Sequence, residues 1–201
     1  TNYFKVDPKF GTEDTLRKLV SKAHSLGLYV ILDGVLGHHG GVSSASPNGN
    51  WPQGGSNPVS YPGSLPYFKE VVQYWINNFE IDGWRLDVAA DLGHSPEMNH
   101  RFWKDFRRVV KETNPNALIL AEHYGDASSW LEGDQWDTVM NYDAFMEPLS
   151  WFLTGLEKHS DRMDEHLYQN SQAFMCAMLS NMSRMQTTSL LAAMNEISNH
   201  D

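Results

Sequence analysis

Three acidic residues, Asp87, Glu122 and Asp201, each close an apolar, strand-like run of this 201-residue chain. Such runs alternate with helical patterns along the sequence. In an alternating α/β chain, acids at strand ends gather at one mouth of a barrel, where side chains from separate strands converge on a substrate. Two carboxylates that face each other across a sugar bond are the usual machinery of glycoside hydrolysis. The pattern therefore predicts a carbohydrate-cleaving site built from strand ends.

A basic residue accompanies the first acid. Arg85 stands two residues before Asp87, and residues two apart in a strand point to the same face. A cation there would orient Asp87 and stabilise its charge, although an ion pair that merely lines the barrel is the plainer alternative. Glu122 follows four apolar residues, and a glutamate in that place could instead cap the next helix.

The elements that must position these side chains can be read from hydrophobic periodicity. Helical stretches are followed by short apolar runs rich in β-branched residues, which is typical of strands buried in a parallel sheet. The expected order is helix 12–27, strand 28–32, loop 37–66, helix 66–79, strand 83–88, helix 95–114, strand 117–121, short helix 128–131, strand 138–142, helices 148–155 and 164–185, and strand 192–198.

The segment 37–66 differs in composition from the rest of the chain. Gly, Ser, Asn and Pro dominate it, with Trp51 and Tyr61 interleaved. A loop of this length inside a compact domain is usually functional. A disordered linker is the alternative.

Bulk composition excludes several classes of protein. The chain is 41% hydrophobic and 12% aromatic, enough for a packed core, and its net charge of −10 argues against nucleic acid or an anionic membrane surface as partner. No apolar run reaches the roughly 18 residues of a membrane span. The single Cys176 excludes an internal disulfide, and we expect it to pack as a small apolar residue in a helix whose methionines fill a helix contact.

The ends of the sequence also carry an expectation. The chain starts without Met or a signal-like segment and stops directly after a strand-like run. We therefore expect both ends to be cut, so that the compartment, the oligomeric state and any flanking domains stay open.

Taken together, the motifs resemble the α-amylase family of glycoside hydrolases. Four family signatures appear in the family's order: Asp33–His38, Gly83–Asp87, Ala121–Glu122 and Asn199–Asp201. Further stretches are similar to the neopullulanase, cyclomaltodextrinase and maltogenic amylase branch: Ile81–Ala89, Phe102–Arg107, and Gly133–Asp137 leading to Met140–Tyr142.

The resemblance implies a fold. It is an α/β fold, a partial (β/α)8 TIM barrel that covers roughly strands three to seven with their helices. Residues 1–201 would then form a catalytic barrel fragment, with 37–66 as an abbreviated inserted loop after strand three.

The resemblance also assigns roles in a retaining mechanism. Asp87 would be the nucleophile, Glu122 the general acid/base and Asp201 the transition-state stabiliser. His38 and His200 would donate hydrogen bonds to sugar hydroxyls. Tyr142 is the preferred aromatic for stacking on a sugar; for it and the other candidates, packing in the core is an equally good interpretation: Trp51, Tyr61, Trp130 and Trp136.

Three positions depart from the family pattern. Gly37 stands where the family usually has an Asn that often helps to bind a structural calcium, so we expect no cofactor and consider calcium doubtful. His123 follows the acid/base where close relatives often have an apolar or aromatic residue. Asp91 replaces a residue often used for contacts on the product side, which leaves the linkage specificity open.

Three functions remain in competition. The first is a retaining glycoside hydrolase that cleaves α-1,4, and possibly α-1,6, glucosidic bonds in maltodextrin-like glucans. The second is a transglycosylase or glucan isomerase that uses the same site. The third is a non-catalytic α-glucan-binding or scaffold subunit, which the presence of all three acids disfavours. In each case the expected partner is an α-glucan oligosaccharide or polysaccharide.

Overall fold

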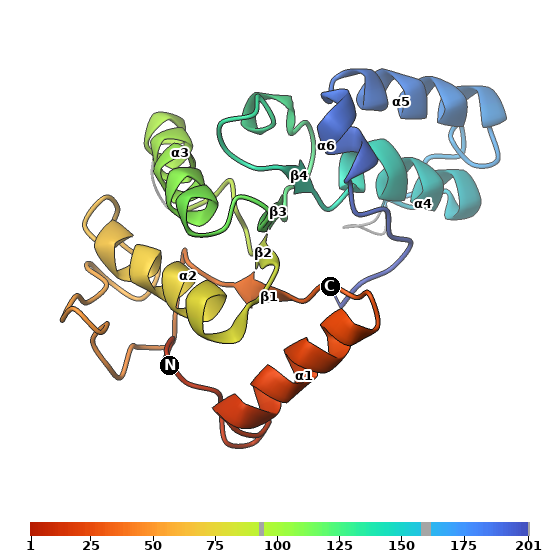
Figure 1. Cartoon of the computed structure of the whole chain (residues 1–201). Coiled ribbons are helices and arrows are strands. Elements are labelled where there is room, and N and C mark those ends of the chain that lie inside the picture. Colours follow the sequence, from red (N-terminus) through yellow and green to blue (C-terminus); the bar gives the residue numbers. More distant parts are fainter. Residues whose placement is uncertain (93–94, 158–161, 201) are drawn as a thin grey trace. The chain divides into compact units, whose positions relative to one another are not determined.

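The computed structural model describes residues 1–92, 95–157 and 162–200. The chain divides into two compact units, Thr1–Ala121 and Glu122–Asp201. The first unit contains a parallel sheet with its covering helices, and the second is mostly helical (Figure 1).

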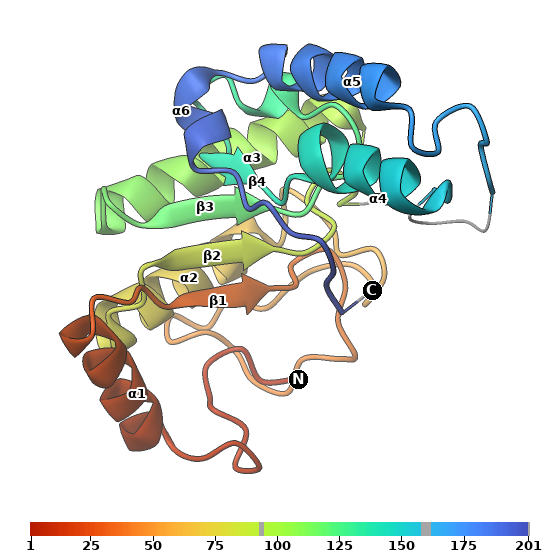
Figure 2. The same cartoon turned by 90° about the vertical axis from the view of Figure 1, so that its right-hand side faces the viewer.

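Three strands form the sheet of the first unit: β1 (Ile31–Gly34), β2 (Gly83–Leu86) and β3 (Leu118–Ala121). They pair in parallel, and Gly34, Leu86 and Ala121 are register partners at the carboxyl ends. Figure 2 shows the three arrows pointing the same way. The predicted parallel sheet is therefore present. The three strands end side by side, so their carboxyl ends lie together.

Helix α1 (Glu13–Ser25) begins and ends where the sequence predicts. Thr12 accepts a hydrogen bond from the Thr15 backbone, and the Thr15 side chain accepts one from the Thr12 backbone, which satisfies two free N–H groups of the first turn. Gly27 follows the last turn with φ +73°, a conformation that glycine adopts without strain. Of the helix residues only Val20 is buried.

The first predicted strand starts later than expected. Leu28 and Tyr29 are 58% and 85% exposed and lie outside the ladder, so the prediction of a strand over 28–32 is wrong at its start. The cause is Asp82. Its carboxylate accepts hydrogen bonds from the Val30 backbone N–H, at 2.7 Å, and from His24 Nε2, at 2.8 Å, so a side chain occupies the donor that a neighbouring strand would otherwise take.

Helices α2 (Leu65–Phe79) and α3 (Pro96–Thr113) lie side by side on one face of the sheet (Figures 1 and 2). Each carries a broad apolar stripe, as expected for a helix that packs on a sheet. In α2 the buried residues are Leu65, Tyr67, Phe68, Val71, Val72, Trp75, Ile76 and Phe79, and in α3 they are Asn99, Phe102, Trp103, Phe106, Val109 and Val110.

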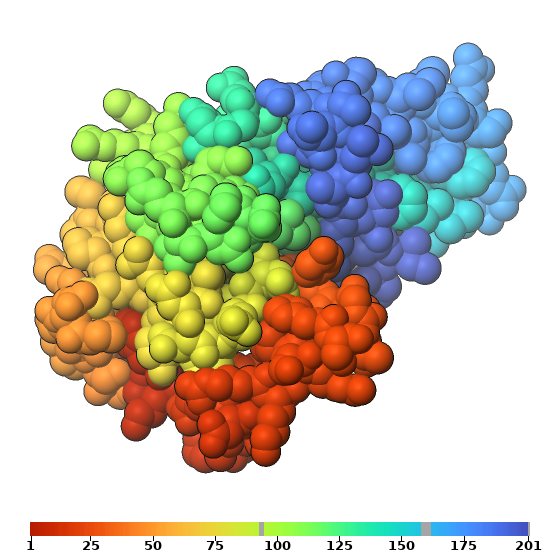
Figure 3. All heavy atoms as spheres, in the orientation of Figure 1, coloured from red at the N-terminus to blue at the C-terminus, as the bar shows by residue number. Residues whose placement is uncertain are grey.

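The segment between β1 and α2 contains neither helix nor strand, only one bridge between Gly54 and Val59. It nevertheless follows a defined course that backbone hydrogen bonds fix at several points. The segment, orange in Figure 3, lies at the surface next to the yellow α2.

The second unit contains short elements: η1 (Ser128–Trp130), β4 (Thr138–Val139), the π-helical η2 (Tyr142–Met146), α4 (Glu147–Thr154), α5 (Ser171–Ser183) and α6 (Thr187–Leu191). The predicted helix 164–185 starts only at Ser171, because the Asn170 side chain accepts the Ala173 N–H and caps the helix there.

The predicted strand 192–198 is not a strand. Met194 forms a single parallel bridge with Met140, and its backbone bonds only Val139 and Asn141. The physical reason is that β4 is just two residues long, so it offers no ladder for a longer partner.

Helix α5 does not bury its apolar residues within the described chain. Met175 and Leu179 are 51% and 60% exposed, and Cys176 is exposed as well. The expectation of a packed Cys176 is therefore wrong, and so is that of a buried Met175, whereas Met178 and Met182 are partly buried on a helix that contacts α4 and η2. The apolar residues are spread around the helix axis and do not form one stripe, so no single face can be buried. None of the helices in the described ranges is long and apolar enough to cross a membrane.

Candidate active site

The predicted contact between Arg85 and Asp87 is present at the carboxyl end of β2. Arg85 Nη1 lies 2.8 Å from Asp87 Oδ1 and 2.9 Å from Asp33 Oδ1. The arginine side chain is mostly buried, whereas Asp87 is partly open to solvent. One guanidinium nitrogen thus holds the carboxylates at the ends of two adjacent strands, and these charge-assisted bonds fix the orientation of Asp87.

His38 joins this group from the segment after β1. Its Nε2 lies 3.9 Å from Asp87 Oδ2, on the carboxylate oxygen that does not bond Arg85. About half of the histidine side chain is exposed. The first unit therefore brings together three of the predicted site residues, with the second oxygen of Asp87 facing the His38 imidazole.

The backbone around Asp87 is fixed on both sides. The Asp87 N–H continues the ladder by donating to the Gly34 carbonyl at 3.1 Å. The next residue, Val88, has φ +44°, which is a rare conformation for a β-branched residue. Strained backbone next to a reactive group is typical of sites where geometry is held by the surrounding structure. Here Trp103 Nε1 donates to the Ala89 carbonyl at 2.7 Å and anchors the turn.

Glu122 follows β3 directly. Ala121, to which it is bonded, is the register partner of Leu86, which precedes Asp87. Within the second unit, Glu122 is 5% exposed, and Tyr124 Oη donates to its Oε1 at 3.1 Å. Tyr124 was missed at the level of sequence. The signal for it was its position two residues after the acid, the same spacing that revealed Arg85.

Tyr142 packs against Tyr124 with its ring tilted. It is fully buried, its ring centroid is 4.4 Å from that of Tyr124, and its hydroxyl accepts a hydrogen bond from Asn199 Nδ2. Burial raises the pKa of the Tyr142 hydroxyl, and the nearby charges of Glu196 and Glu122 act in the same direction. Its role as a stacking platform for sugar stays a prediction.

The last predicted motif is described only in part. His200 is exposed, and Asn199 joins Tyr142 as above. Asp201 lies outside the described residues. The proposed role of the third acid therefore rests on the sequence motif.

The other aromatic candidates divide by exposure. Trp130 and Trp136 are buried and stack on each other with centroids 4.7 Å apart. Tyr61 is buried and donates to the Leu36 carbonyl. Trp51 is 49% exposed. Among these four aromatics, only Trp51 presents a large face to solvent.

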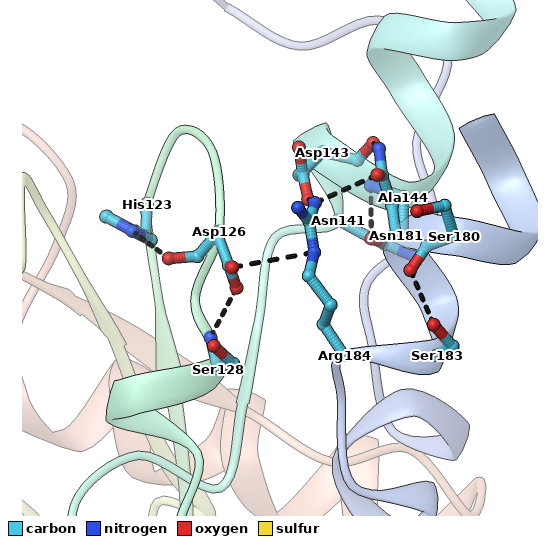
Figure 4. Close-up of polar contacts among 10 residues, drawn as sticks. All are labelled: His123, Asp126, Ser128, Asn141, Asp143, Ala144, Ser180, Asn181, Ser183 and Arg184. Carbon is cyan, nitrogen blue, oxygen red and sulfur yellow. Dashed lines mark hydrogen bonds and ion pairs between the residues drawn. The ribbon is translucent and has the colours of Figure 1, made fainter.

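An ionic network supports the segment after Glu122 (Figure 4). Arg184 lies between Asp126, whose Oδ2 is 3.5 Å from Arg184 Nε, and Asp143, which binds Arg184 Nη2. His123 Nε2 donates to the Asp126 carbonyl at 3.1 Å. Burial lowers the pKa of His123, and the backbone hydrogen bond from Ser128 is the main cause of a lowered pKa at Asp126.

The residues at the family's calcium position do not offer the oxygen ligands that calcium needs. Gly37 has no side-chain oxygen to offer, and the Asp33 carboxylate nearby on the sequence is taken up by Arg85. Ca²⁺ needs six to eight oxygen ligands. In the ranges that the structure describes, no group of three or more His, Cys, Asp or Glu side chains could hold a metal.

Comparison with known proteins agrees with this geometry. The family model described as the alpha-amylase catalytic domain matches residues 1–46 and 65–201, which include every signature motif. The chain belongs to the alpha-amylase catalytic domain family. The match does not include residues 47–64, which lie in the segment between β1 and α2.

Curated relatives place this family member in the predicted branch. A cyclomaltodextrinase of a Bacillus species is 37% identical over an alignment of 185 positions, and the match covers 76% of this chain and 32% of the relative. Neopullulanase 2 of Thermoactinomyces vulgaris is 36% identical over 199 residues, 83% of this chain and 33% of the relative. The chain thus spans about a third of the length of these relatives.

Solved structures support the fold. The cyclic α-maltosyl-(1→6)-maltose hydrolase of Arthrobacter globiformis, in complex with that cyclic sugar, superposes with a TM-score of 0.76 at 25% identity over 99% of this chain and 48% of its own. The predicted family, branch and partial (β/α)8 barrel are confirmed. The boundaries of the inserted loop stay a prediction.

Proposed function

We propose that the intact protein is a retaining glycoside hydrolase that cleaves α-1,4, and also α-1,6, glucosidic bonds in maltodextrin-like glucans. The observation that carries the proposal is the Asp87 carboxylate, held by Arg85 on one oxygen and facing His38 with the other. A nucleophilic carboxylate needs such fixed orientation with one oxygen open to the sugar. Family membership points the same way, and so do the relatives named as a cyclomaltodextrinase and a neopullulanase.

The proposed mechanism has two displacements. In the first, an Asp87 oxygen attacks the anomeric carbon, the glycosidic C–O bond breaks, and Glu122 gives its proton to the leaving oxygen. In the second, water attacks the same carbon, transfers a proton to Glu122 and releases Asp87. Such a mechanism requires the two carboxyl groups about 5 Å apart.

The surrounding residues serve these steps. His38 would donate to a hydroxyl of the sugar whose bond is broken, and His200 would do so from the last motif. The Tyr124 hydroxyl, 3.1 Å from Glu122, would fix the rotamer of the acid/base. Asp201 would stabilise the positive charge that develops on the sugar ring in the transition state.

The test is the release of reducing sugar from maltoheptaose and pullulan by the intact protein. Asp87→Asn keeps the shape of the side chain but removes the nucleophile, and we expect activity to fall by at least about 10³-fold. Asp105→Asn is the matched control, because Asp105 pairs with Arg108 on the outer side of α3. Undiminished activity in Asp87→Asn would refute the assigned mechanism. Accumulation of longer sugars would indicate transglycosylation.

A further inference from the structure

The segment between β1 and α2 presents an uncharged surface. From residue 40 to residue 68 the sequence contains no Asp, Glu, Lys, Arg or His, although 20% of the chain is charged. Amide and hydroxyl side chains dominate it, and its exposed part includes Asn48, Gln53, Ser56 and Asn57. Such a surface suits a neutral, polyhydroxylated ligand and offers nothing to a phosphorylated or acidic one.

Trp51 stands in the middle of this surface with 49% of its area exposed. The backbone on either side is fixed. The Ser46 N–H donates to the Asn50 carbonyl at 2.8 Å, and the Gln53 N–H donates to Ser64 Oγ at 2.7 Å. These backbone hydrogen bonds hold the chain on both sides of Trp51 while its indole stays exposed to solvent.

Glu70 of α2 anchors the turn before Trp51. Its carboxylate accepts hydrogen bonds from Ser46 Oγ at 2.9 Å, from the Asn48 N–H at 3.1 Å, from Asn48 Nδ2 at 3.0 Å, and from Asn50 Nδ2. Hydrogen bonds to an ionised acceptor are the strong class. The helix thus fixes the platform that carries Trp51.

The same segment returns to the catalytic end of β1. The Val59 N–H donates to the Gly37 carbonyl at 3.0 Å, and the His39 N–H donates to the Ser56 carbonyl at 2.8 Å. These two contacts flank His38, which lies 3.9 Å from Asp87. A chain of sugars that extends from Asp87 past His38 would meet this surface next.

We propose that Trp51 forms an additional glucan subsite, at which the indole stacks on a glucosyl residue distant from the bond being cleaved. The proposal rests on the function proposed above and deepens it by assigning a preference for longer chains. The CH faces of glucose are apolar and its rim is rich in hydroxyls, which matches an indole set among amides.

The experiment measures binding without turnover in the intact protein carrying Asp87→Asn. We expect Trp51→Ala to weaken maltoheptaose binding by about tenfold and to change maltose binding less than about twofold. Trp51→Phe retains an aromatic face and should recover most of the loss. Equal effects on the two sugars, or none, would overturn the subsite while leaving the hydrolase function intact.

A second measurement avoids any variant that folds poorly. Limited oxidation of the wild-type protein with N-bromosuccinimide, followed by peptide mass mapping, reports the accessibility of each tryptophan. We expect maltoheptaose to protect Trp51 and maltose to leave it reactive. Trp51 oxidised equally with and without maltoheptaose would overturn the subsite. If the wild-type protein neither bound nor cleaved either sugar, the proposed function would fail, and the subsite with it.

Discussion

At the scale of single residues, Arg85 determines how Asp87 is presented. It is 9% exposed and bonds two carboxylates through one nitrogen. We predict that Arg85→Met lowers kcat about 100-fold with little change in KM, because Asp87 loses its orientation. The free energy of unfolding should fall by about 2 kcal/mol, less than for a fully buried pair, since Asp33 is half-exposed.

The controls separate position from charge. Arg85→Lys keeps a cation and should restore part of kcat, although lysine lacks the planar guanidinium. Arg108→Met removes a guanidinium that pairs with Asp105 on the surface and should change neither kcat nor stability measurably. Wild-type kcat in Arg85→Met would contradict the positioning role.

The sequence could predict this pair but not all of its surroundings. A two-residue spacing within a strand suffices to place Arg85 beside Asp87, because the strand period is local. The second acceptor, Asp33, comes from an adjacent strand, so its role depends on a register that no single run of residues specifies. Tyr124 has the same two-residue spacing from Glu122, but both residues lie beyond the end of β3, where the strand period no longer places side chains.

At the scale of elements, Gly83 determines whether β2 and β3 can pair. It has φ +152°, and a Cβ there would lie 2.2 Å from the Leu118 carbonyl oxygen. We predict that Gly83→Ala lowers the free energy of unfolding by about 3 kcal/mol or more, because backbone atoms of β3 must move. Chemical denaturation of the purified variant measures this change.

Gly27 provides a matched control. Its φ is +73°, but an added Cβ would meet nothing within 4 Å. Gly27→Ala should therefore lower the free energy of unfolding by only about 1 kcal/mol, which is the cost of placing alanine in a left-handed backbone conformation. Similar losses in the two variants would show that the close approach of β2 and β3 is unimportant.

Element types were more predictable than element ends. The helices at Thr12 and Ser95 begin where a capping side chain can accept a backbone N–H, which is a local signal. Before β1, the Leu28 N–H is taken by the Ala23 carbonyl of α1 and the Val30 N–H by the side chain of Asp82, which is distant in sequence. The apolar run after residue 191 looked like a strand but has a two-residue neighbour, so hydrophobicity alone could not decide its structure.

At the scale of the whole molecule, the order of motifs was the strongest signal. The four signatures keep their order along the chain, and the family match confirms the fold that this order implies. Burial was harder to predict, because it depends on what covers a residue. Leu28, Tyr29 and Met175 are apolar yet exposed, so an apolar side chain alone did not show which residues are buried.

The stability of the protein at high pH should be governed by two tyrosines of the first unit, the partly buried Tyr3 and the buried Tyr67. Burial, followed by the influence of Tyr67, raises the pKa of Tyr3 to about 12, and burial raises that of Tyr67 to about 12. Both phenols hold their protons more tightly when folded, since their ordinary pKa is 10.0. Their contribution is complete below pH 10 and is lost as the pH rises through about 12.

We therefore predict that the thermal unfolding midpoint falls steeply above pH 10. In the double variant Tyr3→Phe/Tyr67→Phe neither position can ionise, so the fall should be shallower, although it begins from a lower midpoint because Tyr3 Oη no longer donates to the Val35 carbonyl. Some loss should remain, since burial also raises the pKa of Tyr61. Tyr168→Phe, at an exposed tyrosine of the second unit, should leave the pH profile unchanged. If the double variant lost stability as steeply as the wild type, groups other than Tyr3 and Tyr67 would control alkaline unfolding.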